Sequence, residues 1–206
     1  MEFATRNPLD SAFWDERFDK GFTPWNRGAV PRNLLHYVNL NPVHGDHSGT
    51  VCLIPGCGHA YELDFLKKSG WQVTAIDFSP AAVATAQALF PAHAASILQA
   101  DFFEYQPTSH LECIYERAFF CALPPERRAA VVQRWAELLK PGGVVFGFFF
   151  IDEEAGERPK GPPFRISNTQ LTALMDAQFE RIEDAEVRDS LAVFEGKERW
   201  QIWRRR

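Results

Sequence analysis

The sequence predicts a doubly wound α/β fold built on a mixed sheet. From residue 50 onward, short apolar runs alternate with amphipathic stretches, which is typical of parallel strands joined by crossover helices. The unbroken apolar run Val144–Phe150 is typical of a central strand covered on both faces. The last two strand-like segments are linked through Glu195-Gly196-Lys197 and should pair antiparallel as a C-terminal hairpin.

Apolar periodicity and turn residues predict the individual elements in order. Strands are expected over Thr50–Ile54, Trp71–Ile76, Ala95–Gln99, Cys113–Phe120, Val144–Phe150, Phe179–Arg188 and Arg199–Arg204, and helices over Ala60–Ser69, Ala81–Leu89, Pro124–Leu139 and Asn168–Ala177. Gly70 is expected to end the first of these helices, and Ser79-Pro80 supplies an N-cap and a first-turn proline for the second. The run Lys140-Pro141-Gly142-Gly143 should stop the third.

The N-terminal residues differ from the rest of the chain. Aromatic residues stand among charged ones here, and an apolar stretch follows at Leu34, Leu35 and Val38. We interpret residues 1–48 as an N-terminal helical lid on a core of residues 49–206, all within one domain of 206 residues. The aromatic residues concerned are Phe13, Trp14, Phe18, Phe22 and Trp25.

Composition restricts the classes of function. The chain is 46% hydrophobic and carries a net charge of −5, with no basic stripe apart from its last three arginines, so a small-molecule substrate is favoured over nucleic acid. No signal segment and no apolar run of about 18 residues is present, which predicts a cytoplasmic protein without a membrane partner. We expect a monomer or weak homo-oligomer. The cysteines lack Cys-x-x-Cys spacing, which favours reduced thiols over disulfides or zinc.

A glycine turn follows the first predicted strand. In Gly56-Cys57-Gly58, absent side chains let the backbone pass close to a ligand as the next helix begins. The dinucleotide fingerprint would place a third glycine at position 61, which is Tyr61, so a nucleoside without a pyrophosphate fits better. Taken alone, the motif is also compatible with a structural strand-to-helix turn.

Two acidic residues that follow this turn in the sequence indicate an adenosine-type ligand. Asp77 ends the second predicted strand, where a carboxylate can accept hydrogen bonds from both ribose hydroxyls. Asp101 and Phe102 follow the third strand, where the carboxylate could accept the adenine amino group and the ring could pack on adenine. Nicotinamide-dependent oxidoreductases share the first feature but leave the second unexplained.

Several segments resemble the thiopurine methyltransferase superfamily, and in particular its halide and thiol methyltransferase branch. They are Thr23-Pro24-Trp25, Ile54-Pro55-Gly56-Cys57-Gly58, Ile76-Asp77-Phe78-Ser79, Phe119-Phe120-Cys121-Ala122, Glu137-Leu138-Leu139-Lys140-Pro141-Gly142, Gly161-Pro162-Pro163-Phe164 and Gly196-Lys197-Glu198. This resemblance implies a seven-stranded sheet, S-adenosylmethionine as methyl donor, and an N-terminal region that closes over it. It also implies cofactor contacts from Trp14, Trp25, Gly56, Gly58, Asp77, Phe78, Asp101, Phe102 and Arg117.

Two positions depart from the resembled pattern. Phe18 stands where the family has a third tryptophan, and the position of Arg117 is tyrosine in the plant halide and thiol enzymes but arginine in the thiopurine enzymes. Arg117 ends the fourth predicted strand beside Glu116. It could hold an anionic substrate as the catalytic residue, orient the cofactor carboxylate, or pair with Glu116.

The chemistry expected is methyl transfer to a thiol, hydrosulfide or halide in a pocket lined by the N-terminal aromatic residues and the Gly161–Phe164 loop. A thiol ionises with a pKa near 8.5, so no strong catalytic base is required. The alternatives are a heteroaromatic thiol or ring-nitrogen acceptor, a nicotinamide-dependent oxidoreductase, and a non-catalytic module that binds S-adenosylmethionine. His44, Asp46 and His47 lie in a polar stretch without metal-ligand spacing, and no metal is expected.

Overall fold

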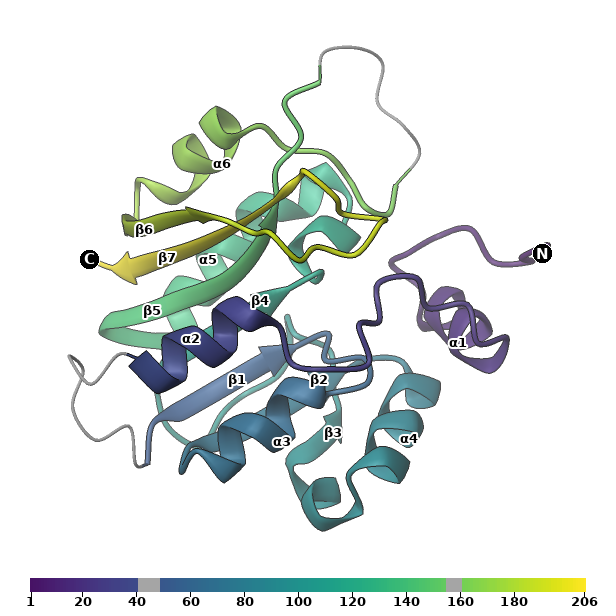
Figure 1. The fold of residues 1–206 in the computed structure, drawn as a ribbon. Coiled ribbons are helices and arrows are strands. Elements are labelled where there is room, and N and C mark those ends of the chain that lie inside the picture. Colours follow the sequence, from purple (N-terminus) through teal and green to yellow (C-terminus); the bar gives the residue numbers. More distant parts are fainter. Residues whose placement is uncertain (41–48, 155–160) are drawn as a thin grey trace. The chain divides into compact units, whose positions relative to one another are not determined.

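The computed structural model describes residues 1–40, 49–154 and 161–206 (Figure 1). Its strands form a mixed seven-stranded sheet in the order β3-β2-β1-β4-β5-β7-β6, which confirms the α/β fold predicted from the sequence. The chain divides into two compact units, Met1–Tyr105 and Gln106–Arg206. Each unit is described in turn.

The first unit contains a parallel three-stranded layer. β1 (Val51–Pro55) pairs in parallel with β2 (Gln72–Asp77), and β2 pairs in parallel with β3 (Ile97–Gln99). Four of the five β1 side chains are buried, as expected for a strand covered on both faces. Crossover helices α3 (Tyr61–Lys68) and α4 (Pro80–Leu89) connect these strands, and Ser79 caps α4 as predicted.

Two helices precede this layer in the chain. α1 (Ser11–Asp19) begins at Asp10, whose side chain accepts a hydrogen bond from the backbone N–H of Ala12, and the helix packs against α4. α2 (Arg32–Leu40) buries Leu34 and Tyr37. The helical character predicted for this region is confirmed, whereas its role as a lid stays a prediction.

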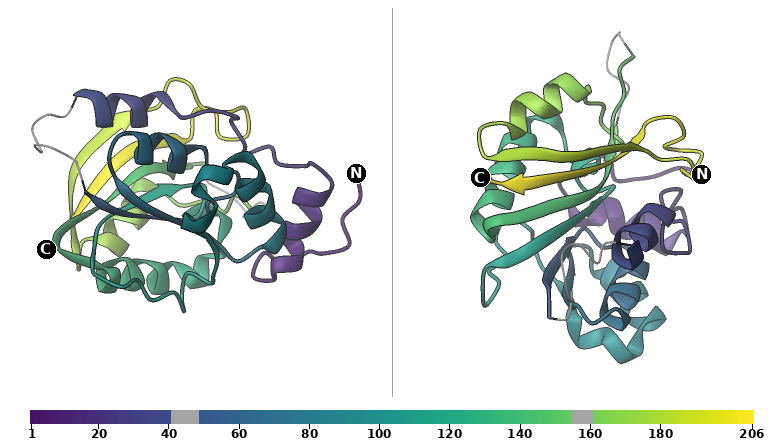
Figure 2. Two further views of the ribbon diagram at one scale, coloured as in Figure 1. Left: turned by 90° about the horizontal axis from the view of Figure 1, so that it is seen from below. Right: turned by 60° about the vertical axis from the view of Figure 1, so that its left-hand side comes forward.

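The second unit contains the remaining four strands. β4 (Leu111–Arg117) pairs in parallel with β5 (Leu139–Phe150), while β7 (Glu198–Arg205) pairs antiparallel with both β5 and β6 (Phe179–Glu186). Figure 2 shows β5, β7 and β6 side by side. The predicted antiparallel pairing of the last two strands is therefore confirmed.

Helices α5 (Arg128–Leu138) and α6 (Asn168–Met175) complete the second unit and pack against each other. The capping box of α6 joins Ser167 and Gln170 through reciprocal hydrogen bonds, which fixes where the helix starts. Large aromatic side chains fill the core of this unit, and Trp135, Phe146, Phe149, Trp200 and Trp203 are all under 3% exposed. Several of the aromatic residues, which make up 14% of the sequence, thus serve core packing.

Several predicted boundaries are wrong. The third strand starts at Ile97 instead of Ala95, because residues 91–96 form a 3₁₀ turn that begins with a proline. The fourth strand ends at Arg117 instead of Phe120, since Ala118 has a φ of 60° and Phe120–Ala122 form another 3₁₀ turn.

The third error concerns the helix predicted over Pro124–Leu139. Pro124 is extended, because a residue that precedes a proline disfavours α-helical geometry, and a 3₁₀ turn at Pro125–Arg127 then precedes α5. The run Lys140–Gly143 is part of β5, where a bulge separates the pair Leu111–Leu139 from the pair Cys113–Val144. In the described ranges, no helix has the length and apolar character needed to cross a membrane.

Candidate functional site

The glycine turn after β1 is tight and tied to the end of β2. Gly56 and Gly58 have φ values of 57° and 51°, in the left-handed region that favours glycine. The backbone N–H of Cys57 donates to the carbonyl of Ile76 over 3.0 Å. The turn therefore lies directly beside the last residues of β2.

Asp77 is the buried centre of this region. Its Oδ2 accepts a 3.1 Å hydrogen bond from the backbone N–H of Gly58, and its Oδ1 accepts a 3.0 Å bond from the backbone N–H of Ser79. The residue is 8% exposed. Because each carboxylate oxygen has more than one lone pair, both retain the capacity to accept a hydroxyl of a ligand.

The pKa of Asp77 reflects two opposing influences. Burial raises the pKa of Asp77 to about 6, the N–H donors of Ser79 and Gly58 oppose that rise, and the nearby charge of Asp15 adds to it. The carboxylate is therefore largely ionised at neutral pH, but close enough to its pKa for modest acidification to protonate it. A ligand that donates hydrogen bonds to this carboxylate would stabilise the charged form.

Asp101 and Phe102 come to the same edge of the sheet as Asp77. Asp77 pairs with Gln99 across β2 and β3, and the backbone N–H of Ala100 donates to the Asp77 carbonyl over 3.0 Å. Phe102 is 4% exposed, while Asp101 is exposed and accepts a 2.8 Å hydrogen bond from the backbone N–H of Phe103. Phe78, directly after Asp77, is partly buried.

A row of rings extends from α1 to the glycine turn. Within this aromatic row, the ring centroids of Trp14 and Trp25 are 5.5 Å apart, those of Trp25 and Phe18 are 6.3 Å apart, and those of Phe18 and His59 are 5.2 Å apart. A Cβ atom built at Gly58 would lie 3.7 Å from the Phe18 ring. Trp14 and Trp25, predicted at the cofactor from the family resemblance, thus belong to a cluster that contacts the turn.

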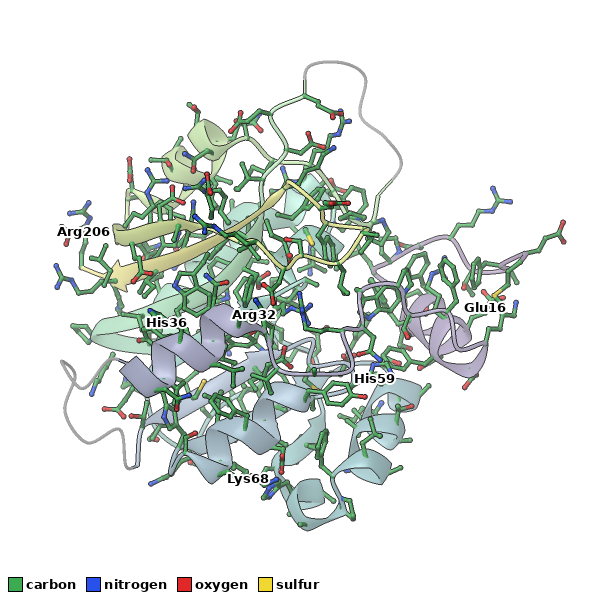
Figure 3. All side chains as sticks on the ribbon, viewed as in Figure 1. Glu16, Arg32, His36, His59, Lys68 and Arg206 are labelled. Carbon is green, nitrogen blue, oxygen red and sulfur yellow. The ribbon has the colours of Figure 1, made fainter. Side chains whose placement is uncertain are left out.

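His59 is a residue that sequence reasoning missed. Its ring stacks with that of Tyr61 at a centroid distance of 6.1 Å, and it directly follows the glycine turn in the chain (Figure 3). Among the described residues, its imidazole has no hydrogen-bond partner, and burial lowers its pKa, so it is neutral at pH 7. Its position immediately after Gly58 was the available sequence signal.

The second unit places Glu116 and Arg117 at the end of β4. Glu116 is 1% exposed, and its Oε1 accepts a 3.0 Å hydrogen bond from the backbone N–H of Phe120. Its Oε2 has no hydrogen-bond partner among the described residues. Burial raises the pKa of Glu116 to about 8, so the side chain is mostly neutral at pH 7 and does not offset the charge of Arg117.

Arg117 is half-buried, and its guanidinium carbon lies 5.8 Å from the centroid of the Phe148 ring. This arrangement combines a permanent positive charge with an aromatic surface at the end of a strand, which suits an anionic or aromatic ligand.

The Gly161–Phe164 segment is anchored beside the turn that follows β4. The backbone N–H of Phe164 donates to the carbonyl of Cys121 over 2.7 Å, and the guanidinium of Arg128 donates to the carbonyl of Phe164 over 3.1 Å. The Cys121 side chain is 4% exposed, and burial raises its pKa well above its usual range. It is therefore a protonated thiol that fills space, not an activated nucleophile.

His44, Asp46 and His47 lie outside the described residues, whereas His36 is exposed on α2 (Figure 3). In ranges 1–40, 49–154 and 161–206, no group of three or more His, Cys, Asp or Glu side chains is arranged to hold a metal ion.

The raised pKa of Glu116 predicts a specific pH dependence of stability. A folded-state pKa of about 8 exceeds the unfolded value of 4.5, so the folded state retains a proton that the unfolded state loses. This contribution is fully present below about pH 4.5 and is lost as pH rises through about 8. Glu116→Gln has no such proton to lose, so its stability should lack this pH dependence. As pH is raised from 5 to 8, the melting temperature of the unmodified protein should fall relative to that of the variant.

Differential scanning calorimetry of both proteins across that pH range makes the comparison. A constant difference in melting temperature at all pH values would contradict a neutral Glu116 in the folded protein.

Comparison with known proteins identifies the family of this chain. The family model described as Thiopurine S-methyltransferase matches residues 9–206. A probable thiol methyltransferase 2 from Arabidopsis thaliana is 29% identical over 201 residues, which cover 95% of this chain and 85% of that protein. A thiopurine S-methyltransferase from Pseudomonas fluorescens is 26% identical, with 89% of each chain covered.

Solved structures agree at the level of the fold. The 1,6-didemethyltoxoflavin-N1-methyltransferase of Burkholderia thailandensis, solved with S-adenosylhomocysteine, superposes with a TM-score of 0.75 at 14% identity, covering 100% of this chain and 93% of that one. The magnesium protoporphyrin IX methyltransferase of Synechocystis, solved with S-adenosylmethionine, gives a TM-score of 0.72 at 14% identity, with both chains fully covered. The family match extends over nearly the whole sequence, and we conclude that this chain belongs to the thiopurine S-methyltransferase family and is an S-adenosylmethionine-dependent methyltransferase.

Proposed function

We propose that this methyltransferase transfers the methyl group of S-adenosylmethionine to a small soft nucleophile, namely a thiol, hydrosulfide or halide. The observation that carries the proposal is the aromatic row of Trp14, Trp25, Phe18 and His59 beside the glycine turn. Polarisable rings favour a sulfonium cation, and their apolar surface disfavours water. Similarity to proteins named for thiol and thiocyanate methylation, at 29% and 26% identity, supports the same acceptor class.

The residues of the first unit fit an adenosyl group. The Asp77 carboxylate keeps acceptor capacity on both oxygens, and the left-handed turn at Gly56 and Gly58 presents backbone without side chains beside it. We assign the ribose hydroxyls to Asp77 and the adenine to Asp101 and Phe102. The remaining cofactor contacts of this unit are assigned to Trp14, Trp25, Gly56, Gly58 and Phe78.

Catalysis by these residues would consist mainly of positioning and exclusion of water. When bound, S-adenosylmethionine supplies an electrophilic methyl group on a positively charged sulfur. Asp77 would hold the ribose, Trp14 and Trp25 would keep water away as the lid of residues 1–48, and Arg117 would attract the anionic acceptor. Because attack by an anion on a cation disperses charge, an apolar enclosure favours the transition state over the separated reactants in water.

A heteroaromatic thiol or ring nitrogen is the second candidate acceptor. Arg117 near the Phe148 ring favours it, because a cation beside an aromatic surface suits a flat anionic heterocycle. Similarity to a thiopurine S-methyltransferase at 26% identity points the same way. We further propose that the protein works in the cytoplasm as a monomer or weak homo-oligomer on small molecules, which its net charge of −5 supports over nucleic acid.

An acceptor panel tests the proposed chemistry. Iodide, hydrosulfide, thiophenol and a thiopurine would be offered with S-adenosylmethionine, and formation of S-adenosylhomocysteine and of each methylated product would be measured. Iodide, hydrosulfide or thiophenol should give the highest kcat/KM. Turnover of the thiopurine alone would instead establish the second candidate, and binding of the donor without transfer to any acceptor would contradict both.

The role of Arg117 is tested by Arg117→Met, which keeps much of the apolar stem and removes the charge. If Arg117 holds the acceptor, KM for hydrosulfide should rise roughly tenfold or more, as expected for a lost charged hydrogen bond, while the Kd for the cofactor stays unchanged. Steady-state kinetics and calorimetry separate the two effects. An increase confined to the cofactor Kd would assign Arg117 to the cofactor carboxylate instead.

The pKa of Asp77 predicts how cofactor binding depends on pH. Ribose hydroxyls donate to the ionised carboxylate, so affinity should be highest above about pH 6 and should fall as protonation proceeds. At pH 5 the affinity for S-adenosylhomocysteine should be about tenfold weaker than at pH 7.5. In Asp77→Asn, binding should weaken at all pH values and lose this dependence.

Isothermal titration calorimetry between pH 5 and 8 provides the measurement. An affinity that is independent of pH in the unmodified protein, or an Asn variant that binds normally, would remove Asp77 from the ribose site.

A further inference from the structure

Asp15 links α1 to the beginning of α4. Its Oδ1 accepts a 2.5 Å hydrogen bond from the Ser79 hydroxyl and a 3.1 Å bond from the backbone N–H of Ala81, although Asp15 and Ser79 are 64 residues apart in sequence. The Ser79 hydroxyl oxygen itself accepts from the backbone N–H of Ala82 over 3.1 Å. The first turn of α4 is therefore capped by its own serine and by a carboxylate from another helix.

The residue that Asp15 binds also holds Asp77. The backbone N–H of Ser79 donates to Oδ1 of Asp77, so the position of Ser79 sets one side of the carboxylate. On the other side, Gly58 donates to Oδ2 of Asp77, and a Cβ atom built at Gly58 would lie 3.7 Å from Cζ of Phe18. Phe18 follows Asp15 by three residues and so shares its face of α1. One face of α1 thus contacts both residues that clamp the Asp77 carboxylate.

The charge of Asp15 also acts on Asp77. In residues 1–105, the Asp15 carboxylate of α1 and the Cys57 thiol of the glycine turn interact electrostatically with Asp77, and the buried Glu62 of α3 interacts with the same thiol. Next to Asp77 in the sheet, β3 presents the uncharged Gln99. Burial raises the pKa of the Cys57 thiol well above its usual range, so it is neutral. Of these groups, the Asp15 carboxylate is the one whose negative charge raises the pKa of Asp77 and so disfavours its ionised form. Donation from ribose hydroxyls would offset this repulsion.

We propose that Asp15 is a positioning residue for the cofactor site, which fixes the turn that presents Asp77 and couples the seating of α1 to cofactor binding. The proposal rests on the assignment of the ribose to Asp77. Through Asp15, the helix that carries Trp14 and Phe18 is held against the carboxylate. Because hydrogen bonds from the ribose relieve the repulsion between Asp15 and Asp77, cofactor binding and the seating of α1 strengthen each other.

Three variants test the proposal. Asp15→Asn keeps an oxygen that can accept from Ser79 and Ala81 but removes the charge, whereas Asp15→Ala removes both hydrogen bonds. Asp19→Ala is the matched control, because Asp19 is an exposed acid on the same helix. The Kd for S-adenosylhomocysteine would be measured by calorimetry from pH 5 to 8 for each variant and for the unmodified protein.

The expected results separate hydrogen bonding from charge. Asp15→Ala should raise the Kd at pH 7.5 roughly tenfold through its lost hydrogen bonds, and Asp15→Asn should restore most of the affinity. Removal of the negative charge should lower the pKa of Asp77, so the Asn variant should keep its affinity to a lower pH than the unmodified protein. Asp19→Ala should match the unmodified protein throughout.

Normal affinity in Asp15→Ala, or an acid limb in Asp15→Asn that coincides with that of the unmodified protein, would overturn the proposal. If Asp15→Ala fails to fold, the acid limb of the Asn variant still decides. If the unmodified protein itself does not bind S-adenosylhomocysteine, the assignment of the site fails before Asp15 is tested.

Discussion

The first unit is organised around one buried carboxylate. Asp77 receives backbone N–H donors from two separate segments, the glycine turn after β1 and the start of α4. A buried anion with few polar partners destabilises the folded state, and each N–H donor reduces that penalty. The charge of Asp77 therefore requires both segments to stay in place. Helix α1 then contacts the same two segments through Phe18 and Asp15. The aromatic row and the Asp77 carboxylate are therefore linked through these two segments.

A second buried acid, Glu116 in the other unit, differs from Asp77 in its charge at neutral pH. Glu116 is at least as buried as Asp77, has one hydrogen-bonded oxygen, and has a pKa raised to about 8. It is mostly neutral at pH 7, and its hydrogen bond stabilises the turn that leads to Cys121 and hence to Phe164. Asp77, with two donors and a pKa of about 6, keeps its charge at neutral pH. Burial disfavours the charge of both acids, and only Asp77 has enough donors to retain it.

Much of the fold followed from the sequence because its signals are local. The apolar run of β1, the N-cap at Ser79 and the alternation after residue 50 each predicted an element that the structure contains. The errors lie at the ends of elements, as at Ala118, where a left-handed residue ends β4 before the apolar run does. Periodicity carries no information about such a residue. The family and the methyl donor were also predicted correctly from the motifs.

The site was only partly predictable, for a physical reason. Asp77, Asp101 and Phe102 follow strand ends, and parallel strands bring such positions to one edge. Asp15 has no such signal, because its partners lie 64 and 66 residues away and are known only once α1 is placed against α4. His59 was overlooked because a histidine after a glycine turn has no periodic meaning. The individual cofactor contacts and the role of Arg117 stay predictions.

The central claim is that Asp77 is a buried carboxylate whose charge the cofactor stabilises. An NMR titration of its ¹³C-labelled side-chain carboxyl, with and without saturating S-adenosylhomocysteine, measures this directly. We expect a midpoint near 6 in the free protein and a midpoint at least one pH unit lower in the complex, since hydroxyl donors favour the ionised form. An unchanged or higher midpoint in the complex would contradict the account.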